Sequence, residues 1–330
     1  MAVTIADIQK LRKMSGAGLS DCKKALTEAA GDFNKAMELV RERGQAIAAK
    51  RSDRETSNGC VLVKKTDGFA AMIALKCETD FVANGADYIK LTQSILDAAV
   101  AVKAKTLDEI KELKLADGMK VQDAVVARSG ITGEKMELDG YMYLEGDNVS
   151  IYDHMNRHIL CTMVQTNKPA EEQAHAVAMQ VAAMNPVALD EASVPQEVKD
   201  SEMKIAIQKT KEQQVEKAVQ AALKKAGFNL YIAESEEHLN EGIMKGYITE
   251  AQAEEIRQIK KTTAEQKAAN LPEQMVQNIA KGRMAKFFKE SCLLNQEFIQ
   301  DSKLSVSDYL KAADKALTVV AFRRFTLRAE

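Results

Sequence analysis

The chain has 330 residues, a formal net charge of −2 and an isoelectric point near 6.2. This length is more than one hydrophobic core usually organises, so two or three domains are expected. The contents of 46% hydrophobic and 28% charged residues exclude a disordered chain. No apolar run is long enough for a membrane span or resembles a signal-peptide core. The near-neutral balance argues against a protein whose main affinity is for the nucleic-acid backbone.

Residue usage also indicates the fold class and the compartment. Only 4 Pro and 16 Gly, beside 15 Met and no Trp, predict a mostly helical chain with few sharp turns. The five cysteines are odd in number and far apart, and no two form a CxxC pair, which argues against a zinc ribbon or a thioredoxin-like site. We therefore expect free thiols in the reducing cytoplasm.

The first 54 residues have the pattern of a small three-helix bundle. Thr4 can cap a first helix that ends at the turn of residues 15–18, and Asp32 can cap a third that ends before Gly44. Residues 1–54 hold 11 Lys and Arg against 7 Asp and Glu, so the bundle is +4 and the remainder −6. This division suits docking to a protein surface better than tracking a phosphate backbone.

After a polar linker the pattern changes from helical to extended. Two strands flank the turn Thr66-Asp67-Gly68, which is a hairpin signal. Further strands are predicted at 141–144 and 159–164, and helices at 86–104 and 170–184. This order favours an α+β fold with an antiparallel sheet covered on one face.

Residues 196–270 show no strand pattern. Apolar residues spaced three and four apart predict a helix that Gly227 can stop, and Thr249 can cap a returning helix. This segment is interpreted as an inserted antiparallel helical hairpin of the coiled-coil kind. The predicted divisions are an N-terminal three-helix domain, an α+β core, the inserted hairpin, and the second part of the core with a C-terminal module, at residues 1–54, 55–195, 196–270 and 271–330.

Few residues have spacings that suggest catalysis. His154, His158 and Cys161 could in principle hold a metal ion, but the residues around them alternate as in a strand and no HExxH motif is present. No Gly-rich phosphate loop and no nucleophile motif occurs. The sequence therefore favours a binding protein without cofactor or metal over an enzyme, and an enzyme that uses these three residues remains the remote alternative.

Residues 77–84, with the sequence CETDFVAN, join a predicted strand to a helix. In one interpretation Thr79 caps the helix, Asp80 favours its dipole and Phe81 packs inward. In the other, Phe81 is displayed beside a carboxylate and can open the helix packing of a partner. Both interpretations stay open at this point.

Five motifs in order along the chain carry a family resemblance. They are GAGLSDCKKAL, AGD, CETDFVA, GRMAKF and LLNQEF, at residues 16–26, 30–32, 77–83, 282–287 and 293–298. Together they resemble the elongation factor Ts family. The resemblance implies an N-terminal module similar to ubiquitin-associated (UBA) domains, an α+β core, a coiled-coil hairpin and a C-terminal module.

The resemblance also implies a function and its residues. The chain would be a guanine-nucleotide exchange factor, not an enzyme, which binds elongation factor Tu in GDP-bound and nucleotide-free forms during translation elongation. The residues implied to dislodge Mg²⁺ from this partner are Thr79, Asp80, Phe81 and Val82. The residues implied to contact it elsewhere are Leu11, Arg12, Leu19 and His154.

Three departures from the family pattern limit this transfer. Ser20 replaces a second large apolar residue, residues 270–272 (NLP) replace a Gly-Lys-Pro turn, and the hairpin is longer than in commonly described forms. Whether the hairpin or core mediates homodimerisation or supports the partner contact is left open. The alternative function is an adaptor that uses the UBA-like bundle for recognition, which binding of residues 1–54 to ubiquitin would reveal.

Overall fold

The computed structural model describes residues 3–328, which form two compact units. The first unit is Met1–Leu189 together with Glu297–Glu330, and the second is Asp190–Gln296. Taken together, the two units consist of helices and small antiparallel sheets, which confirms the predicted α+β class. The division into four parts stays a prediction.

Three helices open the first unit, as the sequence predicts. Thr4 forms a capping box with Asp7 at the start of the first helix, and the Asp32 carboxylate caps the third. Buried side chains around Leu11 and Leu26 form the core of this bundle. The helices are α1 (Ile5–Ser15), α2 (Leu19–Glu28) and α3 (Phe33–Lys50).

The prediction that the third helix ends before Gly44 is wrong, because α3 continues to Lys50. Gly44 lies against Gly130 of the helix α7 (Val121–Thr132). A Cβ atom added to Gly130 would lie 2.2 Å from the Gly44 Cα, so the two backbones cross in direct contact. Gly44 therefore serves a helix crossing and not a helix end.

The strands form two three-stranded antiparallel sheets, so the prediction of a single sheet covered on one face is wrong. The predicted turn at Asp67 and Gly68 joins the first two strands and is confirmed. The first sheet has the order β1 (Asn58–Thr66), β2 (Phe69–Cys77), β3 (Met136–Glu145). The second has the order β4 (Val149–Asp153), β5 (Leu160–Thr166), β8 (Val319–Thr326). A small ribbon joins β6 (Glu297–Phe298) to β7 (Asp301–Ser305).

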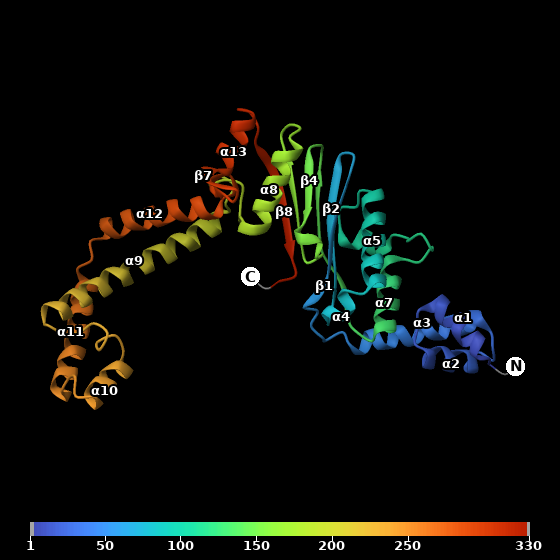
Figure 1. Ribbon diagram of the computed structural model, residues 1–330, viewed down its shortest axis with the longest axis horizontal. Helices are drawn as coiled ribbons and strands as arrows, with labels where there is room; N and C mark the ends of the chain where they lie inside the picture. Colours follow the sequence, from blue (N-terminus) through green and yellow to red (C-terminus); the bar gives the residue numbers. More distant parts are fainter. Residues whose placement is uncertain (1–2, 329–330) are drawn as a thin grey trace. The chain divides into compact units, whose positions relative to one another are not determined.

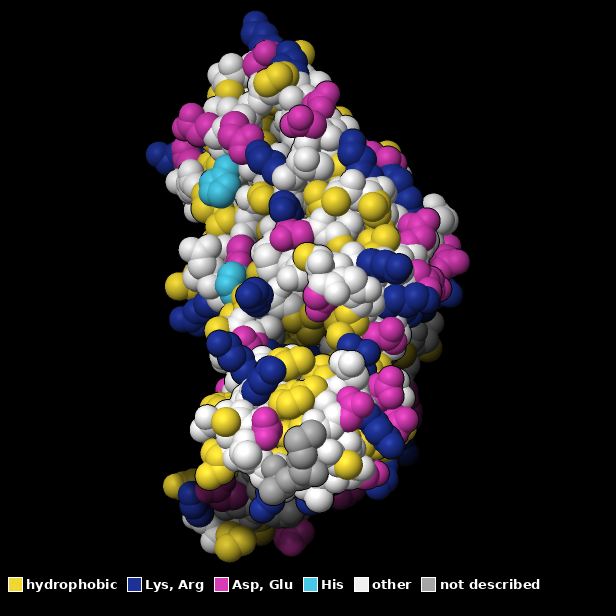
Figure 2. Space-filling view, turned by 90° about the vertical axis from the view of Figure 1, so that its right-hand side faces the viewer, with side chains coloured by type: hydrophobic (Ala, Val, Ile, Leu, Met, Phe, Trp, Pro, Cys, Tyr) yellow, Lys and Arg dark blue, Asp and Glu magenta, His cyan; other side chains and the backbone are white. Residues whose placement is uncertain are grey.

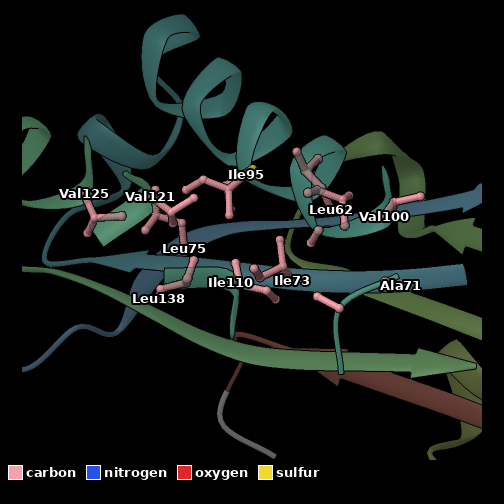
Figure 3. Close-up of a cluster of buried hydrophobic side chains, with 14 of the residues drawn as sticks. Leu62, Ala71, Ile73, Leu75, Ile95, Val100, Ile110, Val121, Val125 and Leu138 are labelled. Carbon is pink, nitrogen blue, oxygen red and sulfur yellow. The ribbon is translucent and has the colours of Figure 1, made fainter. Parts of the chain in front are cut away.

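Each sheet is covered by helices on its outer face, and the two inner faces pack together (Figure 1). The first sheet packs against α5 (Ala86–Ala101), α6 (Leu107–Glu112) and α7, and Figure 3 shows Ile73, Leu75 and Ile95 pointing into this core. The second sheet packs against α8 (Glu171–Met184), where the Thr162 hydroxyl donates to the Ala178 carbonyl. The first unit ends with α13 (Val306–Ala313) before β8.

The strand β2 is the central strand of the first sheet and is buried on both faces. Its side chains alternate between the core under α5 and the core between the two sheets, and only Lys76 is partly exposed. β2 therefore holds the residues that follow Cys77 in a fixed place.

The second unit is helical. The predicted helices at 196–270 are present, and Leu223, Ala253 and Ile256 share a small core. A further helix continues along the first one, where Arg283 donates from Nε to the Thr210 hydroxyl at 3.0 Å. The helices are α9 (Gln196–Lys225), α10 (Glu236–Met244), α11 (Glu250–Ala269) and α12 (Glu273–Ser291).

All five cysteines are buried free thiols. Burial raises the pKa of the Cys60 thiol to about 12, and it also raises the pKa of Cys77. Among residues 3–328, no helix combines the length and the apolar character needed to cross a bilayer.

Candidate functional site

The segment of residues 77–84, called here the 77–84 corner, lies where β2 leaves the sheet. Its one-turn helix α4 (Asp80–Ala83) begins at Thr79, whose hydroxyl accepts the Val82 N–H at 3.4 Å. The predicted N-cap is therefore confirmed. The Cys77 thiol donates to the Thr79 carbonyl at 3.2 Å, which ties the turn to the buried strand end.

Phe81 points away from the protein. Its side chain is 86% exposed, so the interpretation in which Phe81 packs inward is wrong. The next two residues take that place, because Val82 packs on the core under α5 and Ala83 is buried in it. A large aromatic side chain is thus displayed on a short helix whose other side is anchored.

Asp80 is also on the surface. Within residues 3–328 its carboxylate has no hydrogen bond and no ion pair, which leaves it available to a partner. Asp80 lines a pocket of about 250 Å³ together with Arg157 and His158. The corner therefore presents an aromatic ring and an uncompensated carboxylate side by side.

Glu134 holds the corner from the short loop between α7 and β3. Its Oε2 accepts the Thr79 N–H at 3.1 Å, and its Oε1 accepts the Thr79 hydroxyl at 2.6 Å. β2 pairs with β3 so that Cys77 lies opposite Met136, which places residue 134 opposite residue 79. The sheet register therefore brings together two residues that are 55 positions apart.

Glu78 is held in the same way. Its Oε1 accepts the Lys135 N–H at 2.7 Å, and both of its oxygens accept from Arg51 Nη1 at 3.0 Å. The Lys135 N–H and the Arg51 guanidinium together lower the pKa of Glu78. Asn58 Nδ2 also donates to the Glu78 carbonyl at 2.9 Å. Both residues that precede the helix are therefore fixed by several partners.

His154 and His158 lie in a tight loop between β4 and β5. His154 Nδ1 is 3.1 Å from the Tyr152 hydroxyl, and His158 Nδ1 is 2.5 Å from Asp153 Oδ2. Asp153 Oδ1 also accepts the His158 N–H, and His158 itself has a left-handed backbone with φ of 56°. Asp153 thus shapes the loop that carries His154.

The third member of the suggested metal set, Cys161, lies near the start of β5, where its backbone pairs with Asp153. The Cys161 thiol is buried between the sheets and donates to the Val61 carbonyl at 3.4 Å. No three His, Cys, Asp or Glu side chains gather as metal ligands within the described part of the chain, residues 3–328. The spacing alone therefore does not create a metal site there.

The N-terminal bundle exposes some of the predicted contact residues and buries one. Arg12 is exposed and Leu19 is 48% exposed, whereas Leu11 is fully buried in the bundle core. Leu11 can support a contact surface only from inside. Figure 2 shows hydrophobic and basic side chains together at the bundle end, where Ile5 and Met14 are also exposed.

Comparison with known proteins decides the family. The sequence model described as Elongation factor TS matches residues 78–254 and 240–329. The chain belongs to the elongation factor Ts family. The factors named elongation factor Ts of Phocaeicola vulgatus and Bacteroides fragilis are each 62% identical to it, over 330 and 331 residues and the full length of both chains. That of Porphyromonas gingivalis is 44% identical over 331 residues, again over the full length of both chains.

Membership makes this protein an elongation factor of protein biosynthesis with an exchange function. The resemblance recognised from the motifs is thereby confirmed. The roles of the individual residues, from Thr79 to Val82 and at the bundle and His154, stay predictions.

Sequence reasoning missed the residues that hold the corner. Glu134 and Arg51 belong to no motif of chemistry, and neither was singled out; the same is true of Asp153, which shapes the loop that carries His154. The sequence offers one indirect signal: pairing of the strand that ends at Cys77 with the strand that starts at Met136 would bring Glu134 beside Thr79. Finding Glu134 would therefore have required the strand register.

Proposed function

We propose that this elongation factor Ts binds elongation factor Tu carrying GDP and accelerates release of the nucleotide. Phe81 inserts between helices of the GTPase domain, and Asp80 disturbs the Mg²⁺ site beside it. The observation that carries the proposal is the 86% exposure of Phe81 on a corner that Thr79, Val82 and Ala83 anchor. An exposed aromatic of this size is costly to hydrate and gains by entering an apolar partner surface.

Exchange without covalent chemistry requires differential binding. The factor must bind the nucleotide-free partner more tightly than the GDP-bound partner. Because the two binding equilibria are linked, the factor and the nucleotide each lower the other's affinity for the partner by the same ratio. Shifting the partner from a mostly closed to a mostly open population takes about 5.5 kcal/mol of difference in binding free energy between the two states. Burial of one aromatic side chain contributes about 1.5–3 kcal/mol, so Phe81 needs help from Asp80 and from a wider surface.

The bundle and the 153–158 loop supply candidates for the wider surface. Arg12 and Leu19 are exposed on the bundle, and His154 is held beside Tyr152. The bundle is basic while the remainder of the chain is acidic, which favours an oriented approach to a partner. In this proposal most of the chain positions a short insertion.

The test is stopped-flow release of fluorescent GDP from elongation factor Tu at increasing concentrations of the factor. Phe81→Ala is expected to lower the plateau rate about tenfold or more, because the lost burial contributes about 1.5–3 kcal/mol. Val102→Ala, which removes another exposed apolar side chain, serves as the matched control and should leave the rate unchanged. A plateau rate for Phe81→Ala equal to that of the unchanged protein would overturn the proposal.

A further inference from the structure

Two neighbouring helices of the first unit both end at the 77–84 corner. α3 ends at Lys50 and its next residue, Arg51, binds Glu78, while α7 ends at Thr132 and leads to Glu134, which binds Thr79. The two helices cross where Gly44 meets Gly130. The ends of one helix pair therefore supply the Arg51 contact to Glu78 and the Glu134 contact to Thr79, and Asn58 of β1 adds a third contact at the Glu78 carbonyl.

Glu134 is itself fixed before it reaches the corner. Gly133 ends α7 in a left-handed conformation with φ of 71°, and the Glu134 N–H then donates to the Thr132 hydroxyl at 3.3 Å. The Ser129 hydroxyl, which is almost fully buried, donates to the Glu134 carbonyl at 2.5 Å. These contacts leave the Glu134 backbone little freedom, so its carboxylate reaches Thr79 from a fixed point.

The Glu134 carboxylate binds the N-cap residue of a very short helix. Both of its oxygens accept from Thr79, one from the N–H and one from the hydroxyl. A one-turn helix has few hydrogen bonds of its own and is unstable alone, so α4 depends on its anchors. Hydrogen bonds to an ionised carboxylate are about twice as strong as neutral ones. Phe81 follows Thr79 by two residues, so this contact lies at the base of the turn that carries it.

The α3 side connects the corner to the bundle. α3 is the third helix of the bundle that exposes Arg12 and Leu19, and it runs without interruption from Phe33 to the Arg51 contact. The backbone contact at Gly44 keeps it against α7. The bundle surface and Phe81 are therefore held by one continuous frame.

The geometry points to Glu134 as a positioning residue: we propose that it orients Phe81 for insertion without contacting the partner, and that the α3–α7 pair fixes Phe81 relative to the bundle surface. This inference rests on the proposed function. Holding a side chain in its bound orientation beforehand reduces the ordering cost at the moment of insertion. Loss of Glu134 should therefore affect the exchange step more than the formation of the first complex.

The first measurement compares Glu134→Gln with the unchanged protein in stopped-flow GDP release. The amide keeps the size of the carboxylate but places an NH₂ donor against one of the two Thr79 donors. The plateau rate is expected to fall about tenfold, with the half-saturating concentration of the factor changed less than about twofold. Glu112→Gln is the matched control, because Glu112 is an exposed carboxylate paired with Lys120 and should leave both values unchanged.

The second measurement reports the orientation of the side chain directly. The chain has no Trp, so Phe81→Trp introduces a single indole at the corner. Adding Glu134→Gln is expected to lower the fluorescence anisotropy of that indole in the free protein, whereas adding Glu112→Gln is not. Where Glu134→Gln lowers the thermal midpoint, Glu134→Asp replaces it, since that variant keeps the charge and only shortens the reach.

The outcomes separate the two proposals. In one outcome Phe81→Ala lowers the plateau rate of GDP release while the Glu134 variants leave both the plateau rate and the anisotropy unchanged. That result would overturn the positioning role of Glu134 and leave the proposed function standing. An unchanged Phe81→Ala would overturn the proposed function, while a fall in the anisotropy of the Phe81→Trp indole would still support the orienting contact of Glu134.

Discussion

One phenylalanine begins β2 and another lies in α4, shortly after β2 ends, and their environments are opposite. Phe69 begins the strand and is fully buried, stacked on Tyr143 with ring centroids 5.6 Å apart and with the Lys105 ammonium 5.1 Å from its centroid. Phe81 follows the other end of the strand and is 86% exposed. Position in the fold, and not residue type, decides which ring stabilises the protein and which is free to meet a partner.

The largest expected effect is at the buried end. Phe69→Ala should lower the free energy of unfolding by about 3–5 kcal/mol, because it removes a buried ring and leaves a cavity. Phe81→Ala should change it by less than about 0.5 kcal/mol, as for other surface positions. Denaturant unfolding followed by circular dichroism measures both. Similar losses for the two variants would contradict the contrast between the two ends.

The next effect tests the support of the exposed end. Gly130→Ala should lower the free energy of unfolding by about 1–3 kcal/mol, because the new Cβ would lie 2.2 Å from the Gly44 Cα and force the helices apart. Gly44→Ala is the matched control, since its Cβ would meet Gly130 at an ordinary 3.5 Å and alanine favours the helix. Thermal unfolding should rank the two variants in this order, and the reverse ranking would contradict a tight crossing.

The smallest effect concerns pH at the exposed end. The Lys135 N–H and Arg51 lower the folded-state pKa of Glu78 below its ordinary 4.5, so Glu78 contributes stability above that pH and loses it as the pH falls toward the folded pKa. Glu78→Gln should therefore lower the unfolding free energy at pH 7 by about 1 kcal/mol or less. The difference from the unchanged protein should shrink below pH 4.5 in urea unfolding; a constant difference would exclude the ionised contact.

Much of the local structure could be predicted, because its signals are local. Thr4, Asp32 and Thr249 cap the helices they were expected to cap, and Asp67 and Gly68 form the expected turn. What failed depends on contacts between distant segments. Gly44 is of the residue type that often ends a helix, yet it lies inside α3, where the absence of a side chain lets Gly130 pack directly on its backbone. The strands of the first sheet and β5 were predicted as strands, whereas β4 was not, and the division of the strands between two packed sheets has no local signal.

The same distinction applies to the candidate site. The Thr79 cap followed from the sequence, and the family motif identified the residues of the corner. The exposure of Phe81 could not be decided, because an aromatic at a helix start packs inward or outward according to what the neighbouring residues fill. Here Val82 and Ala83 occupy the core position. The contact of Glu134 with Thr79 could not be predicted from the sequence, because it depends on the register between β2 and β3.

The burial of β2 on both faces has a consequence for how the protein opens. A central strand paired on both sides and packed on both faces exchanges its amide hydrogens only when the whole unit opens, whereas a one-turn helix opens locally at little cost. Protection should therefore fall steeply within the few residues between Cys77 and Phe81. A partner can then shift α4 and Phe81 while β2 stays hydrogen-bonded in the sheet, so α4 can adjust on binding without opening the first unit.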